Sequence, residues 1–120
     1  MVAKPHSPSE RAMYRSVWER LRVASDVLLV SPKRPDGDSV GSVCGLRAAL
    51  VTVGQRATLY CPDPIPPTFA GIPHVVEFIV GPAALRGRSF DAIVVVDCGD
   101  LDYAGIAADL PAWRRPGSAF

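Results

Sequence analysis

Two carboxylates separated by one glycine, Asp36 and Asp38, form the part of this sequence best suited to chemistry. They follow an apolar run that ends at Val30 and precede a segment whose apolar residues have helical spacing. Carboxylate oxygens are hard ligands for divalent cations such as magnesium and manganese. The small residues Gly41 and Ser42 allow a phosphate to approach the backbone closely. This segment therefore predicts a metal-dependent site for a phosphate ester.

A second acidic cluster follows another apolar run. Asp97 comes directly after residues 93–96, and Asp100 follows three residues later. A carboxylate at the end of a buried strand is costly unless a cation accompanies it. If Asp97 lies beside Asp36 and Asp38, the three charges repel one another, and a bound divalent cation is the usual resolution. The second cluster therefore predicts a third ligand for the same site.

Both clusters also have explanations that need no ligand. The sequence Pro35-Asp36-Gly37 is typical of a turn, and Asp38 or Ser39 can cap the helix that follows. Asp100 can cap a helix in the same way. The sequence alone leaves the capping and the metal-binding interpretations open.

The elements that must position these clusters alternate between strands and helices. We expect a helix from Ser7 to about Ala24, a second that ends near Gly54, a short helical turn at 82–86 and a last helix from Asp100 to about Leu110. We expect strands at 26–31, 57–61, 75–80 and 90–97, and proline-rich loops at 32–37 and 62–67. Apolar strands without alternation are typical of strands buried on both faces. The pattern predicts an α/β fold with a largely parallel, Rossmann-like sheet flanked by helices, and with its ligand crevice at the carboxyl ends of the strands.

Composition limits the class of protein. The 120 residues suffice for one domain, 48% of them are hydrophobic, and the formal net charge is +1. This argues against a disordered chain and against a nucleic-acid binder that works through bulk positive charge. Three widely spaced cysteines (Cys44, Cys61 and Cys98) indicate reduced thiols. No apolar run approaches the roughly 20 residues that span a bilayer, and the amino terminus lacks a signal-peptide core. We therefore expect a cytoplasmic protein with no membrane partner.

Two segments resemble the motifs of a known family. Residues 35–42 resemble the first motif of the DHH phosphoesterases, usually written HxxPDxDAxGS, and residues 95–100 resemble their second motif, an Asp at the end of an apolar strand. The chain is similar to the group of bifunctional oligoribonucleases and phosphoadenosine-phosphate phosphatases, which are relatives of the exonuclease RecJ. The resemblance extends from about Ser9 to Phe120.

The resemblance implies a hydrolase with two manganese ions and a metal-bound water that attacks phosphorus. Carried over by position, Asp36 would bind one ion, Asp38 the other, and Asp97 would join them. Gly41 and Ser42 would shape the first helical turn beside the substrate phosphate. The implied substrates are a short RNA or DNA oligonucleotide or phosphoadenosine phosphate, and a homodimer of the intact parent is one assembly that the resemblance allows.

The sequence departs from the family pattern in two ways. The leading His of the first motif falls at Pro32, which has no ligating side chain, and neither His6 nor His74 is an obvious replacement. The third motif (Asp-His-His), the fourth acidic motif and the substrate-binding domain are not found in residues 1–120. We therefore expect a truncated domain, the amino-terminal portion of the family's catalytic domain, with little or no activity of its own.

Other residues and other functions stay open. Arg34, beside Lys33, would contact a substrate phosphate or would be a solvated loop charge. Trp18 and Trp113 would stack on a base or lie in the core. One alternative function is a degenerate, non-catalytic domain that binds a nucleotide or a partner. Another is a phosphotransferase with Asp36 as the nucleophile and Asp38 as the acid/base.

Overall fold

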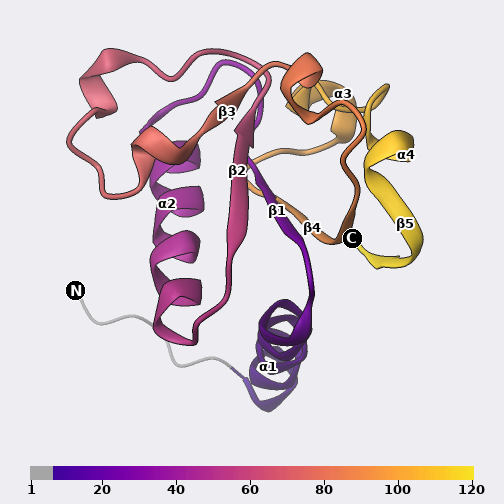
Figure 1. Cartoon of the computed structure of the whole chain (residues 1–120). Coiled ribbons are helices and arrows are strands. Elements are labelled where there is room, and N and C mark those ends of the chain that lie inside the picture. The colour runs from indigo at the N-terminus through magenta and orange to yellow at the C-terminus, as the bar shows by residue number, and fades with distance from the viewer. Residues whose placement is uncertain (1–6) are drawn as a thin grey trace.

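Five parallel strands form the centre of the fold, in the order β3-β2-β1-β4-β5. A computed structural model describes residues 7–120, and Figure 1 shows their arrangement. The strands are β1 (Val27–Val30), β2 (Ala57–Cys61), β3 (Ile79–Val80), β4 (Phe90–Val95) and β5 (Arg114–Ala119). The helices are α1 (Pro8–Val23), α2 (Gly37–Thr52), α3 (Leu101–Ala104) and α4 (Leu110–Trp113), with 3-10 turns at Pro67–Phe69, Val75–Glu77 and Pro82–Leu85. The predicted α/β fold with a parallel sheet is confirmed.

The strand β1 is the centre of the sheet and of the core. Its four residues are fully or almost fully buried, and it pairs with β2 on one side and with β4 on the other. A strand covered on both faces must be apolar at every position, which explains the sequence Val-Leu-Leu-Val. The unalternated apolar run was therefore a correct sign of a central parallel strand.

Helices cover both faces of the sheet (Figure 1). On one face, α2 and Leu21 of α1 pack against Leu29 and Leu59. On the other, α3, α4 and the turn at Pro82–Leu85 pack against Leu28 and Tyr60. The resulting layers are helix, sheet and helix, the usual arrangement for a parallel sheet.

The predicted first helix is confirmed, including its start. The backbone N–H of Glu10 donates to Ser7 Oγ over 3.2 Å, and the Glu10 side chain accepts from the Ser7 backbone, which completes a capping box. The predicted end of α2 at Gly54 is also confirmed, because this residue adopts a φ of 73° directly after the cap. In the predicted apolar face of α1, however, Met13 and Val17 are more than half exposed.

The strand predicted at 75–80 is largely wrong. Its first half is the 3-10 turn Val75–Glu77, and only Ile79–Val80 joins the sheet. His74 precedes the turn with a φ of 71°, and its ring contacts the Glu77 carboxylate at 2.5 Å. Val76 is 90% exposed, so the β-branched residues here do not mark a buried strand. The proline-rich loop before it likewise contains a 3-10 turn rather than irregular chain only.

The helix predicted from Asp100 to Leu110 is interrupted. Asp100 does cap α3, but the helix ends after one turn because Gly105 adopts the left-handed conformation with a φ of 84°. A Cβ at Gly105 would lie 3.2 Å from the Lys33 side chain, so close packing also favours glycine there. The chain then forms α4 and an edge strand, β5, which the sequence analysis did not predict.

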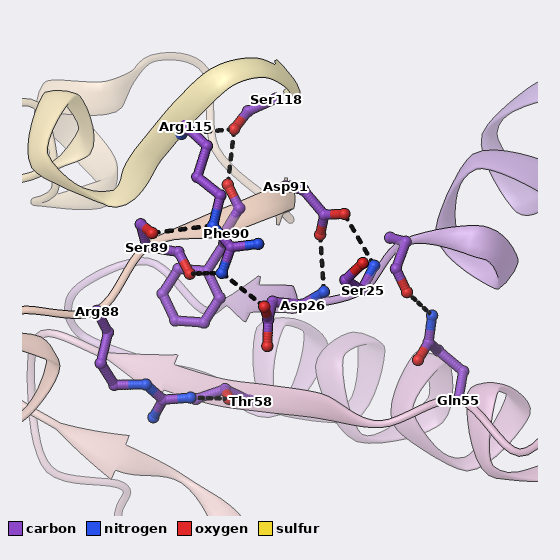
Figure 2. Close-up of polar contacts among 11 residues, drawn as sticks. Ser25, Asp26, Gln55, Thr58, Arg88, Ser89, Phe90, Asp91, Arg115 and Ser118 are labelled. Carbon is purple, nitrogen blue, oxygen red and sulfur yellow. Dashed lines mark hydrogen bonds and ion pairs between the residues drawn. The ribbon is translucent and has the colours of Figure 1, made fainter.

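Polar contacts hold β5 against the amino ends of β4 and β1 (Figure 2). Arg115 donates to Asp26 Oδ2 over 2.5 Å and to Ser89 Oγ over 2.9 Å. The hydroxyl of Ser118 donates to the carbonyl oxygen of Phe90 over 2.6 Å. β5 contains Pro116 and Gly117, and its register with β4 shifts between Phe90 and Ala92, so side-chain contacts supplement an irregular ladder.

Asp91 connects the start of β4 to the turn before β1. Its carboxylate accepts the backbone N–H of Ser25 over 2.8 Å and that of Asp26 over 2.7 Å (Figure 2). Burial alone would raise the pKa of Asp91, but these hydrogen bonds outweigh it, and the pKa lies below its ordinary value of 3.8. The carboxylate therefore contributes stability above that pH, which is lost as the pH falls through the lowered folded-state value.

We expect Asp91→Asn to unfold more easily at neutral pH. After allowance for solvent screening, the loss is about 1 kcal/mol, because one charge-assisted acceptor becomes an amide donor. The measurement is urea unfolding at pH 7 and at pH 3, where the difference from the parent should shrink. A difference that grows toward acid pH would contradict the assigned role of the carboxylate.

Apolar surface remains between α1 and the sheet. A pocket of about 290 Å³ is lined by Val17, Leu21, Val94, Ala119, Phe120 and neighbouring residues.

The three cysteines are free thiols, and of these Cys44 and Cys61 are buried. Within residues 7–120, none of the helices has the length and apolar character that crossing a membrane requires.

Candidate functional site

The two acidic clusters lie beyond the carboxyl ends of adjacent strands. Val30 of β1 pairs with Val95 of β4, and the ladder continues where the N–H of Val96 donates to the Val30 carbonyl over 3.2 Å. Chain connections leave β1 on one side toward β2, and the later strand β4 returns on its other side. Open parallel sheets bind ligands at such a reversal of strand order. The two acidic clusters therefore lie at the edge of the sheet that the sequence pattern predicted for them.

The loop between β1 and α2 is fixed from both sides. The N–H of Ser31 donates to the Tyr60 carbonyl, and that of Lys33 donates to the Ala104 carbonyl, both over 2.9 Å. The N–H of Arg34 donates to Asp63 Oδ2 over 2.7 Å. Arg34 itself has a φ of 54°, an uncommon value for a residue with a side chain. Asp63 was not singled out from the sequence, because nothing in the 62–67 loop indicated a contact with this one.

Asp36 is the N-cap of α2, so the prediction that Asp38 or Ser39 caps this helix is wrong. Its Oδ1 accepts the N–H of Ser39 over 2.9 Å, and Ser39 Oγ accepts the N–H of Asp36 over 3.0 Å. Asp36 has the extended backbone typical of an N-cap residue, with a φ of −116° and a ψ of −176°, so the helix begins one residue later at Gly37. The hydrogen bond from the Ser39 backbone lowers the pKa of Asp36. This carboxylate is therefore ionised and already has a structural role.

The other residues predicted on α2 lie in its first turns. Asp38 is exposed and stands in the first turn, where a negative charge is favoured by the helix dipole. Ser42 is exposed, and a Cβ built on Gly41 would meet no atom within 4 Å. Gly41 is thus not required by packing against any described residue.

Asp97 occupies an unusual backbone position directly after β4. The expectation that burial makes this carboxylate costly without a cation is wrong, because Asp97 is exposed to solvent. Its φ is 55°, in the left-handed region that few non-glycine residues adopt. Its carboxylate has no hydrogen-bond or ion-pair partner within residues 7–120. It lines an open hollow of about 620 Å³ together with Cys98, Asp100 and Tyr103. Asp97 is therefore available to a ligand, whereas Asp36 is partly committed to its helix.

Asp100 behaves as the sequence analysis allowed, as a helix cap. Its Oδ1 accepts the N–H of Tyr103 over 2.6 Å. Burial and the nearby charges of Asp100 and Asp97 raise the pKa of the Cys98 thiol, so this cysteine is protonated. Tyr103, to which the sequence assigned no role, is 62% exposed beside Asp97.

The donors in the described part of the chain do not by themselves make a metal site. Across residues 7–120, no three side chains of His, Cys, Asp or Glu are grouped so that they could hold an ion. Asp36, Asp38 and Asp97 supply suitable oxygen chemistry at one edge of the sheet but do not form such a group. Pro32 is buried, and its carbonyl accepts the Cys61 thiol over 3.4 Å.

His74 does not add a ligand to the three aspartates. His74 is engaged with Glu77, in the 3-10 turn before β3, and Glu77 also accepts Arg47 Nε over 2.9 Å. His6 lies outside the described residues.

The fold places the chain in the class of open parallel α/β domains with a crevice at the strand-order reversal. Its backbone matches a crystal structure of an exopolyphosphatase-related protein from Bacteroides fragilis, with a TM-score of 0.73 and 19% sequence identity over 93% of this chain. The chain spans about a third (34%) of the length of that protein. At this identity the match establishes a shared fold. No family model matches the sequence, and no curated protein matches it either.

Proposed function

We propose that this chain is the amino-terminal part of a DHH-type phosphoesterase. The observation that carries the proposal is the adjacency of β1 and β4, which puts Asp36, Asp38 and Asp97 on one edge of the sheet, beside the start of a sixteen-residue helix. Such a helix start favours an anion, and a parallel sheet binds its ligand at this edge. The name of the matched structure, an exopolyphosphatase-related protein, agrees with phosphoester chemistry.

Manganese is part of the proposal on chemical grounds. Carboxylate oxygens suit this ion, and Asp97 has a carboxylate with no hydrogen-bond or ion-pair partner within the described residues. Since no complete ligand group exists there, we propose that further ligands come from a segment outside residues 7–120. Asp36, Asp38 and Asp97 would be this chain's contribution to the ligands of two ions.

The chain's own contribution to substrate binding would be made at the start of α2. Backbone N–H groups of its first turn, the Ser42 hydroxyl and the Arg34 guanidinium would face a phosphate group. We propose short oligonucleotides or phosphoadenosine phosphate as substrates, with linear polyphosphate as the comparison that the matched structure suggests. Cytoplasmic location and a homodimeric parent remain predictions.

A non-catalytic function is the second candidate, and specific observations favour it. Pro32 stands where the family has its leading His, and Asp36 is used as a helix cap. A domain that has lost ligands in this way can still bind a nucleotide phosphate at the start of α2. The two candidates differ in whether the longer protein hydrolyses a phosphate ester: the first requires manganese-dependent hydrolysis that involves Asp97, and the second requires binding alone.

The experiment that separates them measures both binding and turnover. Manganese is titrated into the 120-residue chain and followed by paramagnetic broadening of amide signals, and hydrolysis is measured with the three substrates. We expect broadening at residues 36–38 and 97, little turnover by this chain, and manganese-dependent turnover by a longer gene product that includes the Asp-His-His motif. A longer product that binds phosphoadenosine phosphate without hydrolysing any substrate would favour the non-catalytic function.

Two glycines of α2 provide a matched test of the phosphate position. A Cβ at Gly41 or at Gly45 meets no atom within 4 Å, so both alanine variants should be stabilised by about 0.5–1 kcal/mol. Only Gly41→Ala adds a methyl group near the proposed phosphate, so only it should weaken binding of phosphoadenosine phosphate. The measurements are thermal unfolding and calorimetric titration. Equal affinities of the two variants would place the phosphate elsewhere.

A further inference from the structure

Three arginines line a pocket at the amino ends of β1 and β2, the opposite edge of the sheet from the acidic clusters. The pocket has a volume of about 480 Å³ and is walled by Arg47, Arg56 and Arg88, with Ser25 and Thr58 among its other residues. No feature of the proposed phosphoesterase site uses these side chains. We call it the arginine pocket.

One of these guanidinium groups is held in a fixed place. Arg88 Nη2 donates to Thr58 Oγ1 over 2.9 Å, and its guanidinium lies 5.2 Å from the centre of the Phe90 ring (Figure 2). The hydrogen bond uses one of the five N–H donors of the group, and the ring contact uses none of them. The other donors remain available to a ligand, and little side-chain freedom is lost when they bind.

The charges around the pocket do not balance. Two of the charged groups in its wall are already paired: Arg47 with Glu77 at 2.9 Å, and Asp26 with Arg115 at 2.5 Å. Arg56 and Arg88 have no carboxylate partner within residues 7–120. The Asp91 carboxylate, which binds the backbone N–H groups of Ser25 and Asp26, keeps its charge but is not part of the pocket wall. The wall therefore carries an excess of two positive charges.

We propose that the arginine pocket binds the dianionic phosphate group of a small molecule. Guanidinium groups match the oxygens of a phosphate through paired N–H donors, and two unpaired positive charges match a dianion. The hydroxyl groups of Ser25 and Thr58 provide additional polar contacts. This site is independent of the proposed phosphoesterase function, because it requires neither manganese nor any acidic residue of the first site.

The test uses inorganic phosphate as the probe, at pH 8, in the presence of a metal chelator and at constant ionic strength. Binding is followed by amide NMR signals of residues 25–27 and 56–58. The variants Arg88→Gln and Arg56→Gln each remove one unpaired charge, and Arg86→Gln is the matched control. Arg86 is an exposed arginine two residues from Arg88, and it does not line this pocket.

We expect saturable shifts at residues 25–27 and 56–58, with an affinity for phosphate that is at least about tenfold weaker in Arg88→Gln and in Arg56→Gln and unchanged in Arg86→Gln. Circular dichroism verifies that the variants are folded. Arg56→Gln breaks no side-chain hydrogen bond or ion pair within residues 7–120, so it tests the site even if Arg88→Gln is destabilised. Shifts that do not saturate, or equal weakening by Arg86→Gln, would overturn the proposal and indicate general charge screening.

Discussion

Replacing Asp97 by Asn is expected to lower manganese-dependent phosphoester hydrolysis by more than about 100-fold in the longer protein proposed above. Loss of an outer-shell partner of a metal ligand already costs about 10- to 100-fold, and a direct ligand should cost more. Asn keeps the size of the side chain and tolerates the left-handed backbone at this position, where φ is 55°. The substitution therefore removes the charge and leaves the loop conformation in place. The measurement is kcat/KM for phosphoadenosine phosphate with saturating manganese.

Asp102 provides the matched control for this prediction. It is an exposed aspartate on α3, and it does not line the hollow that contains Asp97. Asp102→Asn removes the same charge and should change kcat/KM by less than about twofold. Thermal unfolding of both variants should match the parent, because neither carboxylate has a hydrogen-bond or ion-pair partner within residues 7–120. If Asp97→Asn kept most of its activity, Asp97 would not be a ligand.

Replacing Trp113 by Ala is expected to lower the free energy of unfolding by about 3–5 kcal/mol. Trp113 is 3% exposed, and its ring meets the ring of Tyr60 edge-on at a centroid distance of 5.0 Å. The side chain closes the second face of the sheet at the junction of α4 and β5. Its removal leaves a cavity that the surrounding strands cannot fill. Urea unfolding at neutral pH measures the loss.

Two other substitutions provide comparisons for the loss of unfolding free energy in Trp113→Ala. Trp18→Ala should cost clearly less, because Trp18 is only partly buried beside the first core cluster. Tyr60→Phe should stabilise the protein by about 1 kcal/mol, because the Tyr60 hydroxyl is buried without a hydrogen-bond partner among the described residues. Burial raises the pKa of Tyr60 to about 12, so the hydroxyl is protonated at neutral pH. Equal losses for the two tryptophan variants would contradict the assigned packing of α4.

The central strands could be predicted from the sequence because a strand that is buried on both faces is a short, mostly apolar run. Val27–Val30 has no polar alternation and ends before Ser31 and Pro32, and Ala57–Cys61 ends before Pro62, so both strands were recognisable. The edge strand Arg114–Ala119 has no such pattern, since it contains Pro and Gly and is stabilised by side-chain contacts. The residues of β4 with which it pairs lie more than twenty positions earlier in the sequence, so the local sequence does not indicate this pairing.

The placement of the two acidic clusters was predicted from the sequence, and their local contacts were predicted less well. Placing both acidic clusters on one edge needed only the rule that parallel strands share a carboxyl end. The choice of cap needed the actual backbone: three candidates lie within four residues, and the extended conformation after Pro35 selects Asp36. The hydrogen bond from the Arg34 backbone to Asp63 joins two loops whose residues are 29 positions apart. Contacts of this kind depend on tertiary structure and leave no trace in local sequence.

The order of the strands also has a consequence for how the chain is made. The backbone before β1 binds Asp91, 65 residues later, and Asp26 binds Arg115, 89 residues later. At about 5–20 residues per second, a ribosome needs about 3 to 13 seconds to synthesise the first of these intervals. Until then β1 has one open edge that can pair with other chains. β1, the first strand to leave the ribosome, is therefore paired on both edges only after β4 has been synthesised. The nascent chain is most exposed to misassembly during that interval.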